Sequence, residues 1–151
     1  WDGYGDMIIS AYNADPDGRS NAGTSYIIFG KSSGFSDIDL ASLSISAGFS
    51  IKGGASNDQS GYSLAHLGDI NGDGYDDVMI AAPFAYVILG KAFGFSTIDL
   101  ANLSNSDGFT IQVTSANYYT GGGDSNDYSG WVGGVSGDIN NDNYNKYSKF
   151  R

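Results

Sequence analysis

The stretch that decides the fold is Gly30-Lys-Ser-Ser-Gly-Phe-Ser-Asp-Ile-Asp-Leu-Ala-Ser-Leu43. It occurs a second time, 60 residues later, as Gly90-Lys-Ala-Phe-Gly-Phe-Ser-Thr-Ile-Asp-Leu-Ala-Asn-Leu103. A second motif recurs as Gly68-Asp-Ile-Asn-Gly-Asp-Gly-Tyr75 and Gly137-Asp-Ile-Asn-Asn-Asp-Asn-Tyr144. The N-terminal Asp2-Gly-Tyr-Gly-Asp6 also matches Asp73-Gly-Tyr-Asp-Asp77. Because the matches follow one order along the chain, the sequence is a tandem repeat of one supersecondary unit.

Each unit is predicted to form four short strands, which in the second unit cover residues 61–67, 78–82, 86–89 and 109–113. Clusters of Gly, Asn, Asp and Ser separate these segments, as is usual at the ends of strands. The second and third strands are almost wholly apolar, and so are Met7–Ile9 and Tyr26–Phe29 in the first unit. Such runs indicate strands that are buried on both faces.

Four-stranded antiparallel sheets that stack face to face around an axis meet this requirement, because each sheet covers its neighbours. We therefore predict an all-β fold made of β-propeller blades, with a stacked sandwich of the same hairpins as the alternative. Residues 1–52 would supply strands two to four of one blade, and residues 53–113 a complete blade with a candidate calcium loop. Residues 114–151 would supply a loop insertion and the start of a third blade.

About four to eight blades are needed to close a propeller, and this chain holds roughly two and a half. Either it is part of a longer polypeptide, or several copies form a homo-oligomer through the edge strands at both ends. The start at Trp1, without an initiator Met, is expected of a processed product or a fragment. Only Pro83-Phe-Ala85 joins the second and third strands of the second unit. We expect either a tight turn there or, as the favoured alternative, the loss of a mobile loop.

The amino-acid composition further restricts which folds and which classes of function are possible. All 17 acidic residues are Asp, Gly occurs 23 times and Pro twice, which argues against helices. The net charge of −10 makes nucleic-acid binding unexpected, because phosphates are neutralised by clustered Lys and Arg. The absence of Cys excludes disulfides, zinc–thiolate sites and thiol nucleophiles. The longest apolar run, Val78–Leu89, is interrupted by Pro83 and is too short for membrane insertion.

The sharpest chemical signal lies between the first two strands of the second unit. Asp69, Asn71 and Asp73 place side-chain oxygens at positions 1, 3 and 5 of a loop that has the Tyr75 carbonyl at position 7 and Asp77 at position 9. Oxygen ligands at this spacing are typical of a Ca²⁺ loop. An EF-hand would need Glu at position 12, where an apolar strand runs instead, so we predict a calcium loop within a β-hairpin. A Gly/Asp-rich turn without metal is the alternative.

Two further copies of the loop are weaker candidates for metal binding. Asp138, Asn140 and Asp142 keep positions 1, 3 and 5, but Lys146 stands at position 9 and has no acceptor. At the N-terminus, Asp2 and Asp6 occupy positions 5 and 9, and the other positions would lie before Trp1. These sites are expected to be weakened, lost or completed by other residues.

The second unit resembles the FG-GAP repeat of integrin α-subunit-type β-propellers through the stretch Ser60-Gly-Tyr-Ser-Leu-Ala-His-Leu-Gly-Asp-Ile-Asn-Gly-Asp-Gly-Tyr-Asp-Asp-Val-Met-Ile-Ala-Ala-Pro83. It departs from the family pattern at Ser60, where Phe is usual, and at Ala81, where Gly is usual. The spacer between the strands resembles bacterial secreted or surface members. The resemblance implies a seven-bladed propeller in full-length relatives, calcium in the inter-strand loops, and roles in adhesion or as accessory modules of extracellular enzymes.

We therefore expect a non-enzymatic, calcium-stabilised module that is extracellular or on the cell surface and binds an unknown protein or glycan ligand. Extracellular calcium concentrations suit a site of low affinity. A candidate ligand loop is the 114–124 insertion, with Tyr118 and Tyr119, although a simple surface excursion is the alternative.

Two other functions use the same residues differently. In a lectin, Trp131 could stack on a sugar together with the two insertion tyrosines, although Trp131 is more simply explained by packing between blades, as is Tyr62 at the matching position. In an accessory domain of a polysaccharide-degrading enzyme, paired carboxylates could act as acid and base. His66 could join a triad, but no nucleophile motif accompanies it, and we expect a packed structural histidine.

Overall fold

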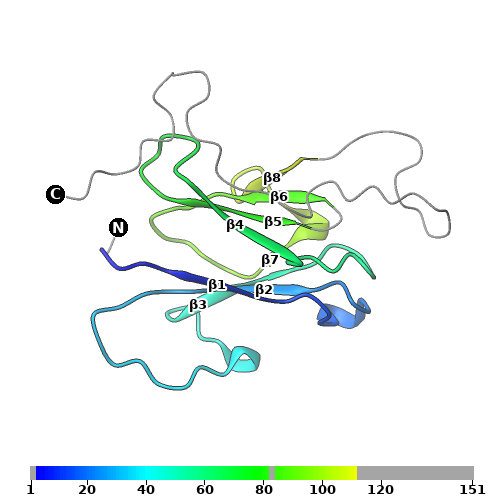
Figure 1. Cartoon of the computed structure of the whole chain (residues 1–151), viewed down its shortest axis with the longest axis horizontal. Helices are drawn as coiled ribbons and strands as arrows, with labels where there is room; N and C mark the ends of the chain where they lie inside the picture. Colours follow the sequence, from blue (N-terminus) through cyan, green and yellow to red (C-terminus); the bar gives the residue numbers. More distant parts are fainter. Residues whose placement is uncertain (1–2, 82–83, 112–151) are drawn as a thin grey trace.

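Residues 3–81 and 84–111, which the computed structural model describes, form two four-stranded sheets (Figure 1). The described strands are Met7–Ala11 (β1), Thr24–Ile28 (β2), Gly48–Lys52 (β3), Ser63–Gly68 (β4), Asp77–Ala81 (β5), Ala85–Ile88 (β6), Ile98–Asp99 (β7) and Gly108–Ile111 (β8). Short 3-10 turns cover Pro16–Gly18 (η1), Leu40–Ser42 (η2) and Leu100–Asn102 (η3). No α-helix occurs in the described ranges, so the all-β prediction is confirmed.

The first sheet has the strand order β1-β2-β3-β7, and the second has the order β4-β5-β6-β8. Pairing is antiparallel throughout the second sheet. In the first sheet, β7 pairs parallel to β3 through Ile51 opposite Ile98. This strand comes from the second sequence repeat, so the second unit contributes backbone hydrogen bonds to the sheet of the first. Two stacked four-stranded sheets are compatible with adjacent blades of a partial propeller.

The connection between β5 and β6 is short. The two strands pair as far as Ala81 opposite Ala85, which leaves only three residues between them. Residues 82 and 83 of this connection lie outside the described residues, so the choice between a tight turn and a lost loop stays a prediction.

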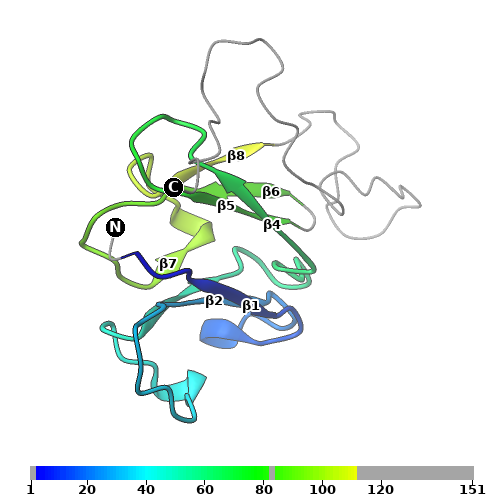
Figure 2. The same ribbon diagram turned by 60° about the vertical axis from the view of Figure 1, so that its left-hand side comes forward.

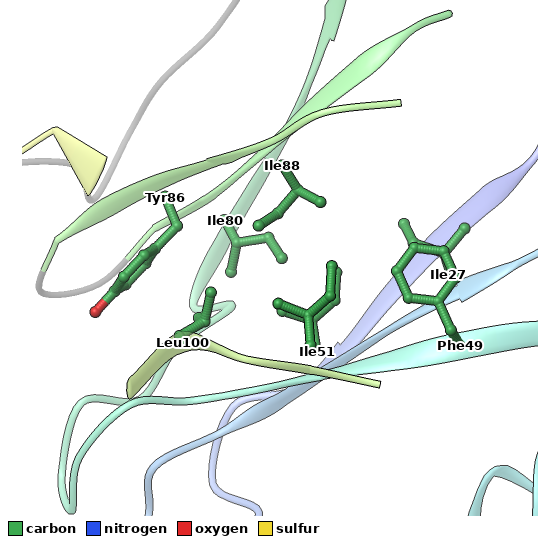
Figure 3. Close-up of a cluster of buried hydrophobic side chains, with 8 residues drawn as sticks. Ile27, Phe49, Ile51, Ile80, Tyr86, Ile88 and Leu100 are labelled. Atoms are coloured by element: carbon green, nitrogen blue, oxygen red, sulfur yellow. The ribbon is translucent and has the colours of Figure 1, made fainter. Parts of the chain in front are cut away.

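The hydrophobic core lies between the two sheets (Figure 3). Phe49 and Ile51 of β3 face Ile80 of β5, while the connection from β6 to β8 runs between the sheets (Figure 1). Ile80 is fully buried and Ile51 is 1% exposed. The complete buried cluster comprises Ile27, Phe49, Ile51, Ile80, Tyr86, Ile88, Ile98 and Leu100. Burial of these side chains is the main force that holds the sheets together.

The expectation that Met7–Ile9 is buried on both faces is wrong. Met7 is 53% exposed and Ile9 is 37% exposed, whereas Ile8 packs against the core cluster. The strand therefore alternates between a covered and an open face. By contrast, every residue of β6 is buried, as its apolar sequence predicts.

A cluster of charged side chains links the two repeats. Arg19, in the connection between β1 and β2, donates to Asp99 of β7 at 2.8 Å and to the carbonyl of Gly54 at 3.1 Å. Arg19 also forms an ion pair with Asp17, and Asp17 forms a second ion pair with Lys52. The hydrogen bond from Arg19 is the main reason why the pKa of Asp99 is lowered from 3.8. The cluster therefore favours the ionised form of Asp99 in the folded protein.

Removing this cation should change the pH dependence of stability. A carboxyl group whose pKa is lowered by folding stabilises the protein above its unfolded pKa, and this contribution disappears as the pH falls through the folded value. Arg19→Met should therefore lower the free energy of unfolding at pH 7 by about 0.2–1 kcal/mol, because the pair is partly exposed. The difference from wild type should shrink below pH 4. Urea unfolding at pH 7 and pH 3 measures both effects, and Lys31→Met, which removes a cation stacked on Phe35, serves as the control. A pH-independent difference would contradict this interpretation.

Candidate metal-binding loop

The candidate loop joins β4 to β5 in an antiparallel hairpin. A register shift between His66 and Gly68 ends the regular pairing, and Gly68 lies opposite Asp77 where the loop closes. Gly72 and Gly74 have φ angles of 77° and 92°, in the left-handed region that favours glycine. The prediction of a β-hairpin loop rather than a helix-flanked loop is confirmed.

Asp69 organises the first half of the loop. Its Oδ1 accepts hydrogen bonds from the backbone N–H groups of Gly72 at 2.7 Å and Asp73 at 3.0 Å. Its Oδ2 accepts from the N–H of Gly74 at 2.8 Å. A short acidic side chain that accepts from the backbone a few residues ahead is a common way to stabilise a turn. The carboxylate at position 1 therefore lies over the centre of the turn.

Asn71 and Asp73 continue the same arrangement. The Asn71 Oδ1 accepts from the N–H of Asp73 at 2.9 Å, and the Asn71 side-chain amide donates to Asp73 Oδ2 at 2.9 Å. The other oxygen of Asp73 accepts from the N–H of Tyr75, also at 2.9 Å. The structure thus brings Asp69, Asn71 and Asp73 together around one turn, as their spacing predicts.

Asp77 has a different environment, which the sequence did not reveal. It is fully buried, and its two oxygens accept from the N–H groups of Ile70 at 3.0 Å and Gly90 at 2.8 Å. Burial is the main cause of its raised pKa, the two backbone N–H groups lower it, and the negative charges of Asp73 and Asp69 raise it further. Asp77 therefore fastens the end of the loop to the chain that leaves β6.

The same fastening occurs in the first repeat. Asp6, which matches Asp77 in the sequence, accepts from the N–H of Gly30 at 2.8 Å. A Cβ atom at Gly30 or Gly90 would overlap the backbone carbonyl of Gly5 or Asp76, respectively. Glycine is therefore required at the start of the repeated Gly-Lys stretch. The joint recurrence of these aspartates and glycines was the sequence signal that could have revealed this contact.

The structure describes some of the other residues that the sequence singled out, and the rest lie outside the described ranges. Within the described ranges, no three His or Asp side chains gather in a cluster of the kind that holds a metal ion. His66 is 62% exposed and lies 3.2 Å from Asp76, so the expectation of a packed histidine is wrong. Tyr62 is half-exposed and meets the ring of Tyr12 edge-on, 5.3 Å between centroids, which links the two repeats. The remaining candidates lie outside the described residues: Asp2, Tyr118, Tyr119, Trp131, Asp138, Asn140 and Asp142.

Comparison with known proteins supports the sequence resemblance. A protein-family model of the FG-GAP repeat matches residues 60–98, a segment that contains β4, the candidate loop, β5 and β6 and reaches the first residue of β7. No curated protein matches the chain. In the part of the chain that the structure describes, no helix has the length and apolar character needed to cross a bilayer.

Proposed function

We propose that this chain, which contains an FG-GAP repeat, is a calcium-stabilised, non-enzymatic binding or adhesion module of the β-propeller type that acts outside the cell. FG-GAP repeats are generally non-catalytic and are typical of extracellular and surface proteins. The observation that carries this proposal is the 69–77 loop, in which three oxygen-bearing side chains surround one turn inside the matched repeat.

The loop fits Ca²⁺ through the chemistry of its donors. Calcium takes six to eight oxygen ligands, and carboxylates, amide oxygens and backbone carbonyls are its usual protein ligands. The side chains of Asp69, Asn71, Asp73 and Asp77 and the carbonyl of Tyr75 would hold the ion. Weaker sites would use Asp2 and Asp6, and Asp138, Asn140 and Asp142.

The electrostatics of the loop also favour a cation. The negative charges of Asp73 and Asp69 both raise the pKa of Asp77, so each of them disfavours the ionised form of the Asp77 carboxylate. Among the residues that the structure describes, no Lys or Arg forms an ion pair with any of the three. A divalent ion would offset the effect of these two charges on Asp77 and would tie the end of β4 to the start of β5. Its contribution would be structural.

The ligand would bind elsewhere, on loops at one end of the stacked sheets, as binding residues usually do on a rigid scaffold. The ligand would be a protein or a glycan, and the 114–124 insertion with Tyr118 and Tyr119 is the candidate contact region. Calcium would then act indirectly, by keeping the scaffold folded.

Calcium should stabilise the wild-type chain and not the Asp73→Ala variant. A ligand at tenfold excess over its Kd that binds only the folded state raises the free energy of unfolding by about 1.4 kcal/mol. We expect this gain in the wild type and in Asp37→Ala, which removes an exposed carboxylate outside the loop. Urea unfolding in calcium and in EDTA, with isothermal titration of calcium, measures the effect. An equal gain in Asp73→Ala, or none in the wild type, would refute the proposed metal site.

A further inference from the structure

The contact between the two repeats is directional, because each repeat contributes a different set of residues to it. The first repeat contributes Phe49 and Ile51 from β3, which are 5% and 1% exposed. The second contributes Ile80 from β5 and Ile98 from β7, which are 0% and 6% exposed. Phe95 of the second repeat also stacks on Phe49, with 4.9 Å between ring centroids and 15° between ring planes.

The same five residues recur, unchanged, on the two outer faces of the pair. Phe109 and Ile111 match Phe49 and Ile51 in the sequence, whereas Ile9, Phe35 and Ile38 match Ile80, Phe95 and Ile98. Their exposures, however, are very different: Phe109 45%, Ile111 55%, Ile9 37%, Phe35 61% and Ile38 41%. Each outer face therefore displays the half of the buried contact that the other outer face lacks.

The two outer faces lie at opposite ends of the stack. Figure 2 shows the connection between β2 and β3 beyond the first sheet and β8 on the far side of the second. The corresponding connection between β6 and β8 lies between the sheets in both views (Figures 1 and 2). We call the surface of Ile9, Phe35 and Ile38 the front face, and the surface of Phe109 and Ile111 the back face.

We propose that a second copy of this chain covers these faces, with the back face of one copy packed on the front face of the next. The contact would repeat the one that already exists between the two repeats, including a parallel backbone pairing of Ile111 with Ile38 of the other copy in the manner of Ile51 with Ile98. Because two different faces meet, the association is heterologous and runs head to tail. It uses the sheet faces as well as the edge of β8, whereas the sequence suggested strand edges alone.

The proposed contact is apolar. The ion pair from Arg19 to Asp99 has no counterpart in it, because the second repeat has only Ala82, Pro83 and Phe84 where the first has the connection that carries Arg19. Each copy also carries a net charge of −10, so the copies repel one another at long range. Association should therefore be measured at high ionic strength, about 0.5 M NaCl, where the Debye length is only a few ångströms.

Two single variants test the proposal separately and together. Phe109→Asp disables the back face and leaves the front face intact, whereas Ile38→Asp does the reverse. Sedimentation velocity or light scattering should show that the wild type exceeds 15.8 kDa and grows with concentration, while each variant stays at that mass. An equimolar mixture of the two variants should form a dimer of twice that mass and grow no further. The control Phe93→Asp, at a side chain that is 83% exposed, should associate like the wild type.

Each other result would overturn the proposal. A wild type that stays monomeric at all concentrations would mean that something other than a second copy covers the faces, such as residues 112–151 of the same chain. Variants that still associate would point to the strand edges, and a mixture that remains monomeric would exclude the head-to-tail contact. Circular dichroism checks that the variants are folded, and Phe35→Asp with Ile111→Asp provides a second pair on the same two faces.

Discussion

Replacing Asp77 with alanine should lower the free energy of unfolding by roughly 2–6 kcal/mol, with or without calcium, because each buried polar group left without a partner costs about 1–3 kcal/mol. The Asp77 carboxylate is fully buried and accepts from the N–H groups of Ile70 and Gly90. Alanine would leave both donors without that acceptor and would release the end of the loop from the chain after β6.

Urea unfolding in EDTA measures this loss without a contribution from calcium. Asp6→Ala is the matched control, because Asp6 makes the equivalent bond to Gly30 at an exposed position, where water can replace the lost acceptor. We expect its loss to be about 1 kcal/mol or less. If Asp77→Ala proved harmless in EDTA and destabilising only in calcium, its carboxylate would serve the metal alone. This outcome would contradict the fastening role.

The second large effect is expected at the contact between the sheets. Ile51→Ala should lower the free energy of unfolding by about 2–5 kcal/mol, because it removes buried methyl and methylene groups and leaves a cavity that the rigid sheets cannot close. Ile51 is 1% exposed and lies between β3 and the second sheet, next to Ile80 (Figure 3).

The chain provides its own control for this substitution. Ile111 occupies the same position in the second repeat and is 55% exposed, so Ile111→Ala should cost less than about 1 kcal/mol. The unfolding of both variants should be measured at a protein concentration below that at which copies of the chain associate. Equal losses would show that Ile51 is not a core residue, or that the Ile111 face is covered within a single chain.

The strands could be predicted from the sequence because the signals are local. Apolar runs bounded by Gly and Asp predicted the second and third strands of the first two units, and the structure places β5 and β6 within one residue of the expected ends. The turn formed by Asp69, Asn71 and Asp73 was likewise predictable, since it depends on side chains that bond to their own neighbourhood.

Contacts between distant segments were not predictable in the same way. The burial of Met7 and Ile9 depends on whether a second sheet lies on that side of β1, which their hydrophobicity cannot indicate. The pairing of β7 with β3 joins two residues of one repeat to the other, too short a segment to leave a periodic pattern. Arg19 reaches Asp99 across 80 positions of sequence. His66, flanked by apolar neighbours, reads as a core residue but extends to Asp76 at the surface.

The transfer of β7 to the neighbouring sheet has a consequence for how the protein comes apart. A chain cut near residue 53 would deprive the first half of the backbone partner of β3 and of the carboxylate that receives Arg19. In the intact chain, neither repeat can therefore unfold without removing contacts that the other repeat uses. The two repeats should accordingly unfold in a single cooperative transition rather than as two independent units.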